Sequence, residues 1–503
     1  MRIACVGGGP GGLFFATLIK RRCPQAEVAV FERNRPDDTF GFGVVFSDAT
    51  LDVIGAADPD LAERMREVGR YWDTIEVWMS GQIERCGGMG TAAVVRKTLL
   101  HLLQESAIEA GVDLRFETTV SSPAELADYD LVVVADGSNS LLRDSFAKDF
   151  GPSTDTATAK FVWFGTTYMF EGLTFVYNQS EHGAFAVHGY PIDDEKSTFI
   201  VEADPETWKA AGLDEFDVSR PPGESDAKTQ RYLTELFADQ IGGAPLLENN
   251  SRWGNFRSRR VNSWSRHDAR TSWVLLGDAA HTAHFSVGSG TKMAMEDAIV
   301  LADKVAGADL RTALAEYESE RRPKVERIQS LGRPSLLWWE HFGRYMDSFE
   351  PTQFAFHFLT RSISREKLAK RDAGFVARAD ADWQARHGHA PLETPLYTQA
   401  GSIPGRLLGT ADGIAGCAWL TAPETEEGLP AAYRELAAHA ADGPVVLGIR
   451  GGSRLTRLIL SEEARLRHHL LVLVQGDYTQ DEARTMIQSG RTDLVVTPGT
   501  ASR

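Results

Sequence analysis

The sequence predicts an α/β protein that begins with a Rossmann-like dinucleotide-binding domain. An apolar run at residues 2–7 leads into a glycine-rich turn, a helical pattern covers residues 11–22, and a second apolar run follows at residues 27–31. A strand, a helix and a parallel strand in this order form a crossover unit. After residue 160, segments rich in aromatic and β-branched residues predict a second domain built on an antiparallel sheet.

Length and composition limit the class of protein. A chain of 503 residues exceeds one hydrophobic core, so two or three domains are expected. The net charge of −17 argues against general binding of nucleic acid or anionic membranes, although a local arginine cluster could still bind an anion. The four cysteines lack metal-binding spacing, and no apolar run reaches membrane-spanning length. We therefore expect a cytoplasmic protein with no metal site.

The remaining elements follow from the same patterns. Residues 96–110 predict a helix that ends at Gly111, residues 130–135 and 272–277 predict buried strands, and residues 291–305 predict another helix. Helical spacing dominates from residue 310 to about residue 386, and Pro and Gly become frequent after residue 388. The predicted domains are a nucleotide-binding domain (1–159 with 266–330), an antiparallel-sheet substrate domain (160–265), a helical layer (331–387) and a small α/β C-terminal domain (388–503).

The first motif is a phosphate-binding turn, Gly7-x-Gly9-x-x-Gly12, between the first strand and its helix. Its glycines allow a tight turn and a close approach of pyrophosphate to the helix N-terminus. Glu32 ends the second strand, where a carboxylate accepts hydrogen bonds from ribose hydroxyls, and Arg33 follows it. The turn alone leaves open whether the nucleotide is NAD or FAD.

Two later motifs follow buried strands in the same way. Asp136-Gly137 ends the run DLVVVA, and Gly277-Asp278 ends the run SWVLL and leads to a second glycine-rich loop. In their order along the chain, the three motifs resemble those of the single-component (group A) FAD-dependent aromatic hydroxylases. Without that resemblance, Asp136 and Asp278 would be helix caps, and the glycines of the later loop would be turn residues.

The resemblance implies FAD as the cofactor. It places Asp278 on the flavin ribityl chain, the backbone N–H groups of Gly288, Gly290 and Thr291 near the isoalloxazine, and Arg96 near the phosphates; a solvated helix residue is the alternative for Arg96. No second GxGxxG, CxxC or WxWxIP motif occurs, which speaks against flavin disulfide reductases and halogenases. In the group A family, NADH or NADPH binds transiently and O2 is the other co-substrate.

Longer phrases resemble one branch of this family, the salicylyl-CoA 5-hydroxylases. They include GFGVVFSDATL, EHGAFAVHGYP and GDAAHTAHFSVGSGTKMAMEDAI, and the similarity covers about residues 1 to 385. The resemblance implies hydroxylation of an aromatic CoA thioester, salicylyl-CoA to gentisyl-CoA, through a flavin C4a-hydroperoxide. The alternatives are another aromatic substrate (anthraniloyl-CoA, a free aromatic acid or an indole), a flavin oxidoreductase that inserts no oxygen, and a flavin-binding scaffold without turnover.

Candidate substrate residues follow from that resemblance. His284 and Phe285 stand where related hydroxylases carry a Pro-Pro pair at the flavin, and His188 and Tyr190 lie in the aromatic-rich region. We expect these four to form the catalytic pocket, with packing roles as the alternative for His188 and Tyr190. An arginine-rich segment offers phosphate ligands for CoA, or a solvated basic loop instead; the candidates are Arg257, Arg259 and Arg260.

The C-terminal region resembles the last βα units of an old-yellow-enzyme barrel, at PVVLGIRGG and at residues 469–499. The roughly 115 residues available are too few for an eight-stranded barrel. We therefore expect a truncated, non-catalytic remnant of such a barrel, with an ordinary small α/β domain as the alternative. A homodimer is one option for the assembly.

Overall fold

A computed structural model describes residues 1–39, 41–216, 224–285, 288, 290–399, 401–412, 414 and 416–497. The chain divides into two compact units. The first unit comprises Met1–Thr74 and Met89–Glu340, and the second comprises Ile75–Gly88 and His341–Arg503. No described helix has the length and apolar character needed to cross a membrane.

The first unit contains the predicted dinucleotide-binding sheet, which has six strands in the order β16-β17-β9-β1-β2-β8. The strands are β1 (Arg2–Val6), β2 (Glu27–Phe31), β8 (Asp113–Arg115), β9 (Leu131–Val134), β16 (Ser265–His267) and β17 (Ser272–Leu275). All neighbours pair in parallel except β16 with β17. The parallel strands are nearly continuous apolar runs because both faces of the sheet are covered.

The described α-helices of this unit are α1 (Pro10–Arg22), α2 (Asp48–Ala57), α3 (Pro59–Val68), α4 (Arg96–Ala110), α5 (Leu141–Ser145), α6 (Ala147–Phe150), α7 (Pro205–Ala210), α8 (Ala227–Leu236), α9 (Gly290–Gly307) and α10 (Leu310–Trp339). Helix α1 is buried along most of its length and packs against both α4 and α9. Helix α4 ends at Gly111, whose φ of 85° is left-handed, so the predicted C-terminal breaker is confirmed.

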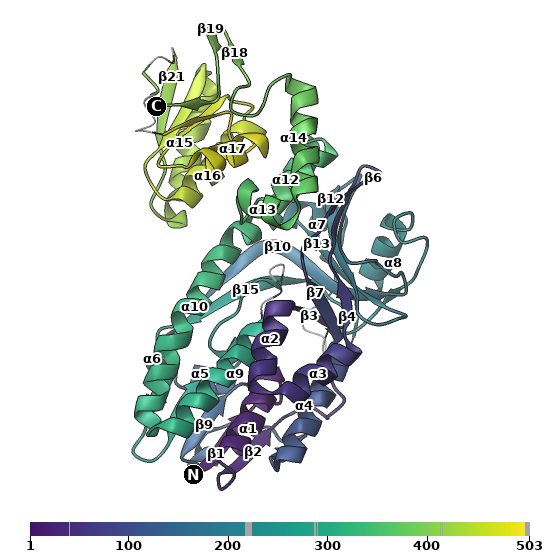
Figure 1. Cartoon of the computed structure of the whole chain (residues 1–503), viewed down its shortest axis with the longest axis vertical. Coiled ribbons are helices and arrows are strands. Elements are labelled where there is room, and N and C mark those ends of the chain that lie inside the picture. Colours follow the sequence, from purple (N-terminus) through teal and green to yellow (C-terminus); the bar gives the residue numbers. More distant parts are fainter. Residues whose placement is uncertain are drawn as a thin grey trace. The chain divides into compact units, whose positions relative to one another are not determined.

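The predicted antiparallel sheet is also present. Its strands in this unit are β10 (Pro152–Thr166), β11 (Leu173–Ser180), β12 (Gly183–Pro191), β13 (Ser197–Ala203), β14 (Leu246–Leu247) and β15 (Gly254–Val261). The order is β14-β10-β13-β12-β11. Strand β15 pairs with the first part of β10, and Figure 1 shows these two strands side by side. A three-stranded sheet accompanies it, in the order β3 (Gly43–Ser47), β7 (Thr91–Val95) and β4 (Arg70–Trp72).

Register decides which side chains of the antiparallel sheet share a face. His188 on β12 stands opposite Phe175 on β11 and Ile200 on β13. Because side chains alternate along a strand, Tyr190 points to the same side as His188. This face is lined with aromatic rings, as the aromatic-rich segments predicted.

In its described residues, the second unit contains helices, two antiparallel strand pairs and a parallel sheet. The first helices are α11 (Phe342–Ser348), α12 (Pro351–Leu359), α13 (Arg365–Arg371) and α14 (Ala373–His387). One strand pair joins β5 (Ile75–Met79) to β6 (Gln82–Cys86), and the other joins β18 (Leu396–Thr398) to β19 (Gly401–Ile403). The described sheet has the order β20-β24-β23-β22-β21, all parallel. Its strands are β20 (Leu407–Leu408), β21 (Cys417–Thr421), β22 (Val446–Arg450), β23 (Val472–Gln475) and β24 (Leu494–Val496).

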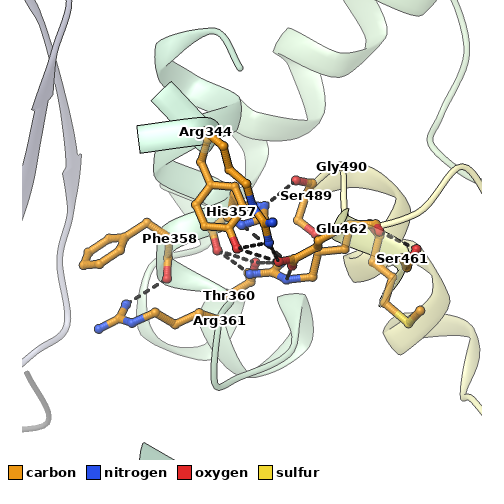
Figure 2. Close-up of polar contacts among 12 residues, drawn as sticks. Arg344, His357, Phe358, Thr360, Arg361, Ser461, Glu462, Ser489 and Gly490 are labelled. Atoms are coloured by element: carbon orange, nitrogen blue, oxygen red, sulfur yellow. Dashed lines mark hydrogen bonds and ion pairs between the residues drawn. The ribbon is translucent and has the colours of Figure 1, made fainter. Parts of the chain in front are cut away.

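Three helices connect β21 to β24, namely α15 (Leu429–Asp442), α16 (Arg454–Glu462) and α17 (Gln480–Gln488). Strands β21 to β24 therefore lie side by side in chain order, each joined to the next by a helix. A buried polar network, which includes Arg344, His357 and Glu462, joins α11 and α12 to the end of α16 (Figure 2). The expected small α/β region is present in the described residues.

Candidate functional site

The glycine-rich turn has the close packing that its spacing predicts. Gly7 has a φ of +114°, and a Cβ on Gly12 would lie 2.1 Å from the backbone oxygen of Gly7. A Cβ on Gly9 would meet no protein atom within 4 Å. Gly9 is also the N-cap of α1, and because glycine has no side chain, no side-chain hydrogen bond caps this helix end. The turn therefore leaves room and backbone N–H groups for a phosphate at this helix end.

Glu32 lies directly beside the turn. Its carboxylate accepts hydrogen bonds from the backbone N–H of Gly8 at 2.7 Å and from the backbone and side-chain N–H groups of Asn34 at 2.8 Å. These bonds hold the acid at the end of β2, as expected for a residue that accepts from ribose hydroxyls. The neighbouring Arg33 is exposed.

The DG and GD turns meet through one buried arginine. Arg143 on α5 donates hydrogen bonds to the backbone oxygens of Ser138 at 3.1 Å and Ala279 at 3.2 Å. Ser140 is the N-cap of α5, and a hydrogen bond from the backbone N–H of Leu142 also favours the charged form of Asp136, so Asp136 takes part in the start of this helix as its structural alternative expected. Burial raises the pKa of Asp136, although Ser140 and Arg143 oppose the shift.

Asp278 is exposed to solvent by surface area, yet the protein around it shifts its pKa. Surrounding protein raises its pKa, while His281, Arg96 and Arg259 favour its charged form. Its side chain is nevertheless exposed by surface area, and the N-cap of the short helix at Gly277–Ala279 is Leu276. A carboxylate enclosed by protein but still accessible fits a residue that binds a ligand's hydroxyls better than a helix cap.

Arg96 is brought to the same place. Desolvation lowers its pKa, and the charge of Asp278 and the Tyr190 phenol oppose that shift. Arg96 begins α4, so the start of this helix, the GD turn and strand β12 converge. This position does not match the alternative of a solvated helix residue.

The loop after the GD motif is described only in part. Gly288 has a φ of +59° and its backbone N–H donates to the Phe285 oxygen at 2.8 Å, and Gly290 and Thr291 begin α9. A Cβ on Gly288 or Gly290 would meet no described atom within 4 Å. Residues 286, 287 and 289 lie outside the described residues. The expected contact of this loop with the flavin stays a prediction.

A network of three side chains beneath the GD turn was not predicted. Asp297 on α9 accepts from the Gly277 N–H at 3.2 Å, from His281 Nε2 at 2.7 Å and from Arg321 Nε at 2.7 Å. Asp297 is fully buried, and these partners hold its pKa below the ordinary value despite burial. The network fixes the turn that carries Asp278. A sequence signal existed, because Asp297 interrupts an otherwise apolar helical face.

The predicted substrate residues come together around Phe285. Its ring centroid lies 5.0 Å from Phe161, 5.8 Å from Trp163 and 5.4 Å from His188. His284 stacks on Phe285 at 4.2 Å. The GD loop thus packs against the aromatic face of the antiparallel sheet.

Tyr190 lies on the same face, at the side of Arg96. Its ring is 6.0 Å from Trp72, and its hydroxyl donates to the Gly43 oxygen at 3.3 Å. Burial raises the pKa of Tyr190 to about 12, so the phenol stays protonated at neutral pH. His188 contacts Glu202 Oε1 through Nε2 at 2.6 Å, and both side chains are buried. Glu202 was missed, although a Glu in the apolar run STFIVEA was a visible signal.

The three predicted CoA-binding arginines do not converge. Strand β15 carries all three, and side chains alternate along it, so Arg257 and Arg259 share one side and Arg260 points to the other. Arg259 donates to Asn139 Oδ1 at 2.8 Å, beside the DG turn, whereas Arg260 donates to Gln329 Oε1 at 3.2 Å. Their role with CoA phosphates stays a prediction. The described residues hold no cluster of acids, histidines and cysteines suited to a metal ion.

Comparisons with known proteins identify the family of this chain. A family profile described as an FAD binding domain matches residues 1–331. The chain is 58% identical to a salicyloyl-CoA 5-hydroxylase of a Streptomyces species, over 98% of this chain and 99% of that protein. It is 39% identical to a 3-hydroxy-4-methyl-anthranilyl-[aryl-carrier protein] 5-monooxygenase of Streptosporangium sibiricum, over 67% of this chain and 89% of that one.

Solved structures share the fold. The tetrameric form of 2-methyl-3-hydroxypyridine-5-carboxylic acid oxygenase matches with a TM-score of 0.55 at 19% identity, over 72% of this chain and 98% of that chain. A dinucleotide-binding sheet whose GD loop packs against an aromatic antiparallel sheet is the class of fold to which this likeness points. Within that class, the profile and the 58% identical relative show that the chain belongs to the FAD-dependent aromatic hydroxylases. It is an FAD-dependent monooxygenase with NAD(P)H and O2 as co-substrates.

Proposed function

We propose that this monooxygenase hydroxylates an aromatic CoA thioester, and that it converts salicyloyl-CoA to gentisyl-CoA. The observation that carries the proposal is the 58% identity to a salicyloyl-CoA 5-hydroxylase, which extends over 98% of this chain. The relative at 39% identity bears the name of a different aromatic substrate and aligns with only 67% of the chain. The full-length similarity therefore favours the CoA thioester.

The cofactor-binding residues have distinct roles in this proposal. Bound FAD, once reduced by NAD(P)H, supplies the activated oxygen that is transferred to the ring. The turn at Gly7, Gly9 and Gly12 binds its phosphates, and Glu32 accepts from a ribose hydroxyl. Asp278 accepts from the ribityl hydroxyls, with Arg96 beside it to balance negative charge. Further proposed contacts are Arg33, Asp136, Gly277, Gly288, Gly290 and Thr291.

The substrate ring would bind between the GD loop and the aromatic face of the sheet. His284 and Phe285 form the flavin side of this pocket, and His188 and Tyr190 contact the hydroxyl or the thioester carbonyl of the substrate. Tyr190 stays protonated because its pKa is raised to about 12, and its hydroxyl would turn from the Gly43 oxygen to donate to the substrate. The surrounding aromatic rings exclude water from the reacting atoms.

The phosphates of CoA would interact with Arg257, Arg259 and Arg260. Arg257 is exposed and points to the same side of β15 as Arg259, so these two act together. Arg260 points to the opposite side of β15, so it contributes only its positive charge to the binding of the CoA phosphates. Guanidinium groups suit phosphate because each offers several donors in one plane.

The remaining proposals concern organisation. The antiparallel sheet and the dinucleotide-binding sheet form separate domains with the boundaries given above. Strands β21 to β24 represent a truncated old-yellow-enzyme-like barrel without catalytic function. Their chain-order pairing supports this, because neighbouring barrel strands pair in the same way. A cytoplasmic homodimer is the proposed form in the cell.

A turnover assay under air tests the proposed function. The purified yellow enzyme is mixed with NADH, with and without salicyloyl-CoA, and nucleotide oxidation is followed together with product mass. We expect the thioester to stimulate oxidation and to give a product one oxygen atom heavier. Stimulation by free salicylate alone would overturn the CoA assignment. NADH oxidation without any hydroxylated product would instead indicate an oxidoreductase that inserts no oxygen.

A further inference from the structure

A buried carboxylate lies in the sheet that forms the proposed substrate pocket. Glu202 on β13 is 1% exposed, and His188 on β12 is 3% exposed. Their side chains meet at 2.6 Å between Oε1 and Nε2. A buried carboxylate is costly unless it is paired, and Glu202 pairs with an imidazole whose ring lies 5.4 Å from Phe285 of the GD loop.

We propose that His188 and Glu202 form a proton-accepting pair that removes the phenol proton of the substrate as the ring is hydroxylated. This inference rests on the proposed function, because it needs a phenolic substrate. His188 is the catalytic residue, and Glu202 is its positioning residue. The pair makes the ring electron-rich at the moment of oxygen transfer.

The chemistry follows from the hydrogen bond. A carboxylate on Nε2 holds that nitrogen as a donor, so Nδ1 is the basic atom of the ring. The O–H bond of the phenol breaks, its proton bonds to Nδ1, and the electron pair stays on the phenolate oxygen. Glu202 stabilises the resulting imidazolium. After oxygen transfer the ring carbon releases its hydrogen as a proton to solvent water, and the electron pair of that C–H bond restores the aromatic ring. The imidazolium then returns its proton to the phenolate oxygen.

The surroundings strengthen this pairing. The His188 ring lies 5.1 Å from Phe175, 4.2 Å from Trp339 and 5.4 Å from Phe285. Apolar neighbours lower the local dielectric and make the charge of Glu202 more effective. Phe285 also connects the pair to the GD loop, where oxygen transfer is expected.

Other titratable groups lie on the elements that pack around the pair. They are Tyr190 on β12, Tyr177 on β11, His284 in the GD loop and Arg96 at the start of α4. Tyr190 donates its hydroxyl hydrogen to the Gly43 oxygen, and its pKa of about 12 makes it a poor route for a phenol proton. Arg96 acts beside Tyr190 and favours the charged form of Asp278.

The test compares Glu202→Gln with wild type on salicyloyl-CoA and on 3-fluorosalicyloyl-CoA, whose phenol is more acidic. The variant keeps the shape and loses the charge. We expect kcat on salicyloyl-CoA to fall about 100-fold, the usual scale for acid–base catalysis. The deficit should shrink on the fluorinated substrate and at higher pH, because a phenol that ionises by itself needs less help. An equal deficit on both substrates at every pH would overturn the proposal.

Controls separate this test from folding and from the proposed function. Asp204→Asn changes a nearby carboxylate that caps the helix at Pro205–Ala210, and it should behave like wild type. FAD content and anaerobic reduction by NADH should be unchanged in Glu202→Gln. If wild type does not turn over the thioester, the proposed function fails and not this pair.

A measurement on wild type needs no variant to fold. Absorbance of bound salicyloyl-CoA, recorded against pH, reports whether the enzyme holds the phenol or the phenolate. The pair predicts that the phenolate appears on the enzyme at lower pH than in free solution. Ionisation at the solution pH or above it would contradict the proposal.

Discussion

Charged groups serve different ends at Glu462 in the second unit and at Asp278 in the first. In the second unit, Glu462 accepts from the Tyr345 hydroxyl at 2.5 Å and pairs with Arg491 at 3.2 Å and Arg344 at 3.4 Å (Figure 2). The charges of these groups are therefore paired with one another. In the first unit, Asp278 lies near Arg96 and Arg259 but remains exposed, and burial by protein raises its pKa.

The difference teaches how to distinguish a binding group from a structural one. Removing one partner from a closed network of buried charges destabilises the fold, because the other partners stay buried and unpaired. A charged side chain that protein surrounds but solvent still reaches adds little to the free energy of unfolding. Such a side chain is available to bind a ligand. Substitutions at Glu462 should therefore change the free energy of unfolding, whereas substitutions at Asp278 should change the affinity for FAD.

The largest effect should come from Gly12→Ala. The new Cβ would lie 2.1 Å from the Gly7 backbone oxygen, so the strand and helix could not pack. We expect loss of folded, flavin-containing protein. In Gly9→Ala the Cβ meets no protein atom within 4 Å, so the fold should persist with weaker FAD binding. Flavin content and thermal unfolding measure both, and identical behaviour of the two variants would contradict this account.

Glu462→Ala should destabilise the protein without changing its affinity for FAD. Removing one member of a buried ion-pair network costs about 3–5 kcal/mol in the free energy of unfolding. Equilibrium denaturation measures this cost. The control is Glu435→Ala, which removes an exposed pair with His439 and should change stability by less than about 1 kcal/mol. A weaker affinity of Glu462→Ala for FAD would break the contrast between the units.

Asp278→Asn should do the reverse. Hydrogen bonds to a charged group contribute about 1.5–3 kcal/mol, so FAD binding should weaken by roughly 10- to 100-fold. The raised pKa means that ionisation of Asp278 opposes folding above the pKa of the unfolded chain, so the apoprotein should not lose stability at neutral pH. Fluorescence titration with FAD measures the affinity. Asp144→Asn, at an exposed neighbour on α5, is the matched control.

His357 should give the smallest effect, a dependence of stability on pH. Burial first, and then Arg491, hold its pKa well below 6.5 in the folded protein. As pH falls through 6.5, the unfolded chain binds a proton that the folded chain does not, so stability should fall by about 1.4 kcal/mol per pH unit. His357→Gln should show a shallower dependence between that pH and about pH 5. Equal slopes in denaturation experiments would contradict this.

Local patterns predicted most of the fold. The strand and turn at Gly12, the buried strand before Asp136 and the breaker at Gly111 each depend on residues close in sequence. The same logic predicted the GD turn, because Gly277 and Asp278 end an apolar run. Strand alternation would also have separated Arg260 from Arg257 and Arg259.

Pairings between distant elements could not be predicted. Asp297 meets Arg321, and Glu202 meets His188, only because helices and strands pack in one register. The link between Glu462 and Arg491 depends in the same way on the packing of the second unit. No spacing in the sequence identifies these partners, although a charged residue within an apolar run signals that one is needed.

The most direct test of the central claim is to run the reaction of the purified enzyme with NADH and salicyloyl-CoA under oxygen-18 gas. We predict a gentisyl-CoA product whose new hydroxyl carries oxygen-18 from O2. A hydroxyl derived from water, or complete conversion of oxygen to hydrogen peroxide with unchanged thioester, would contradict it.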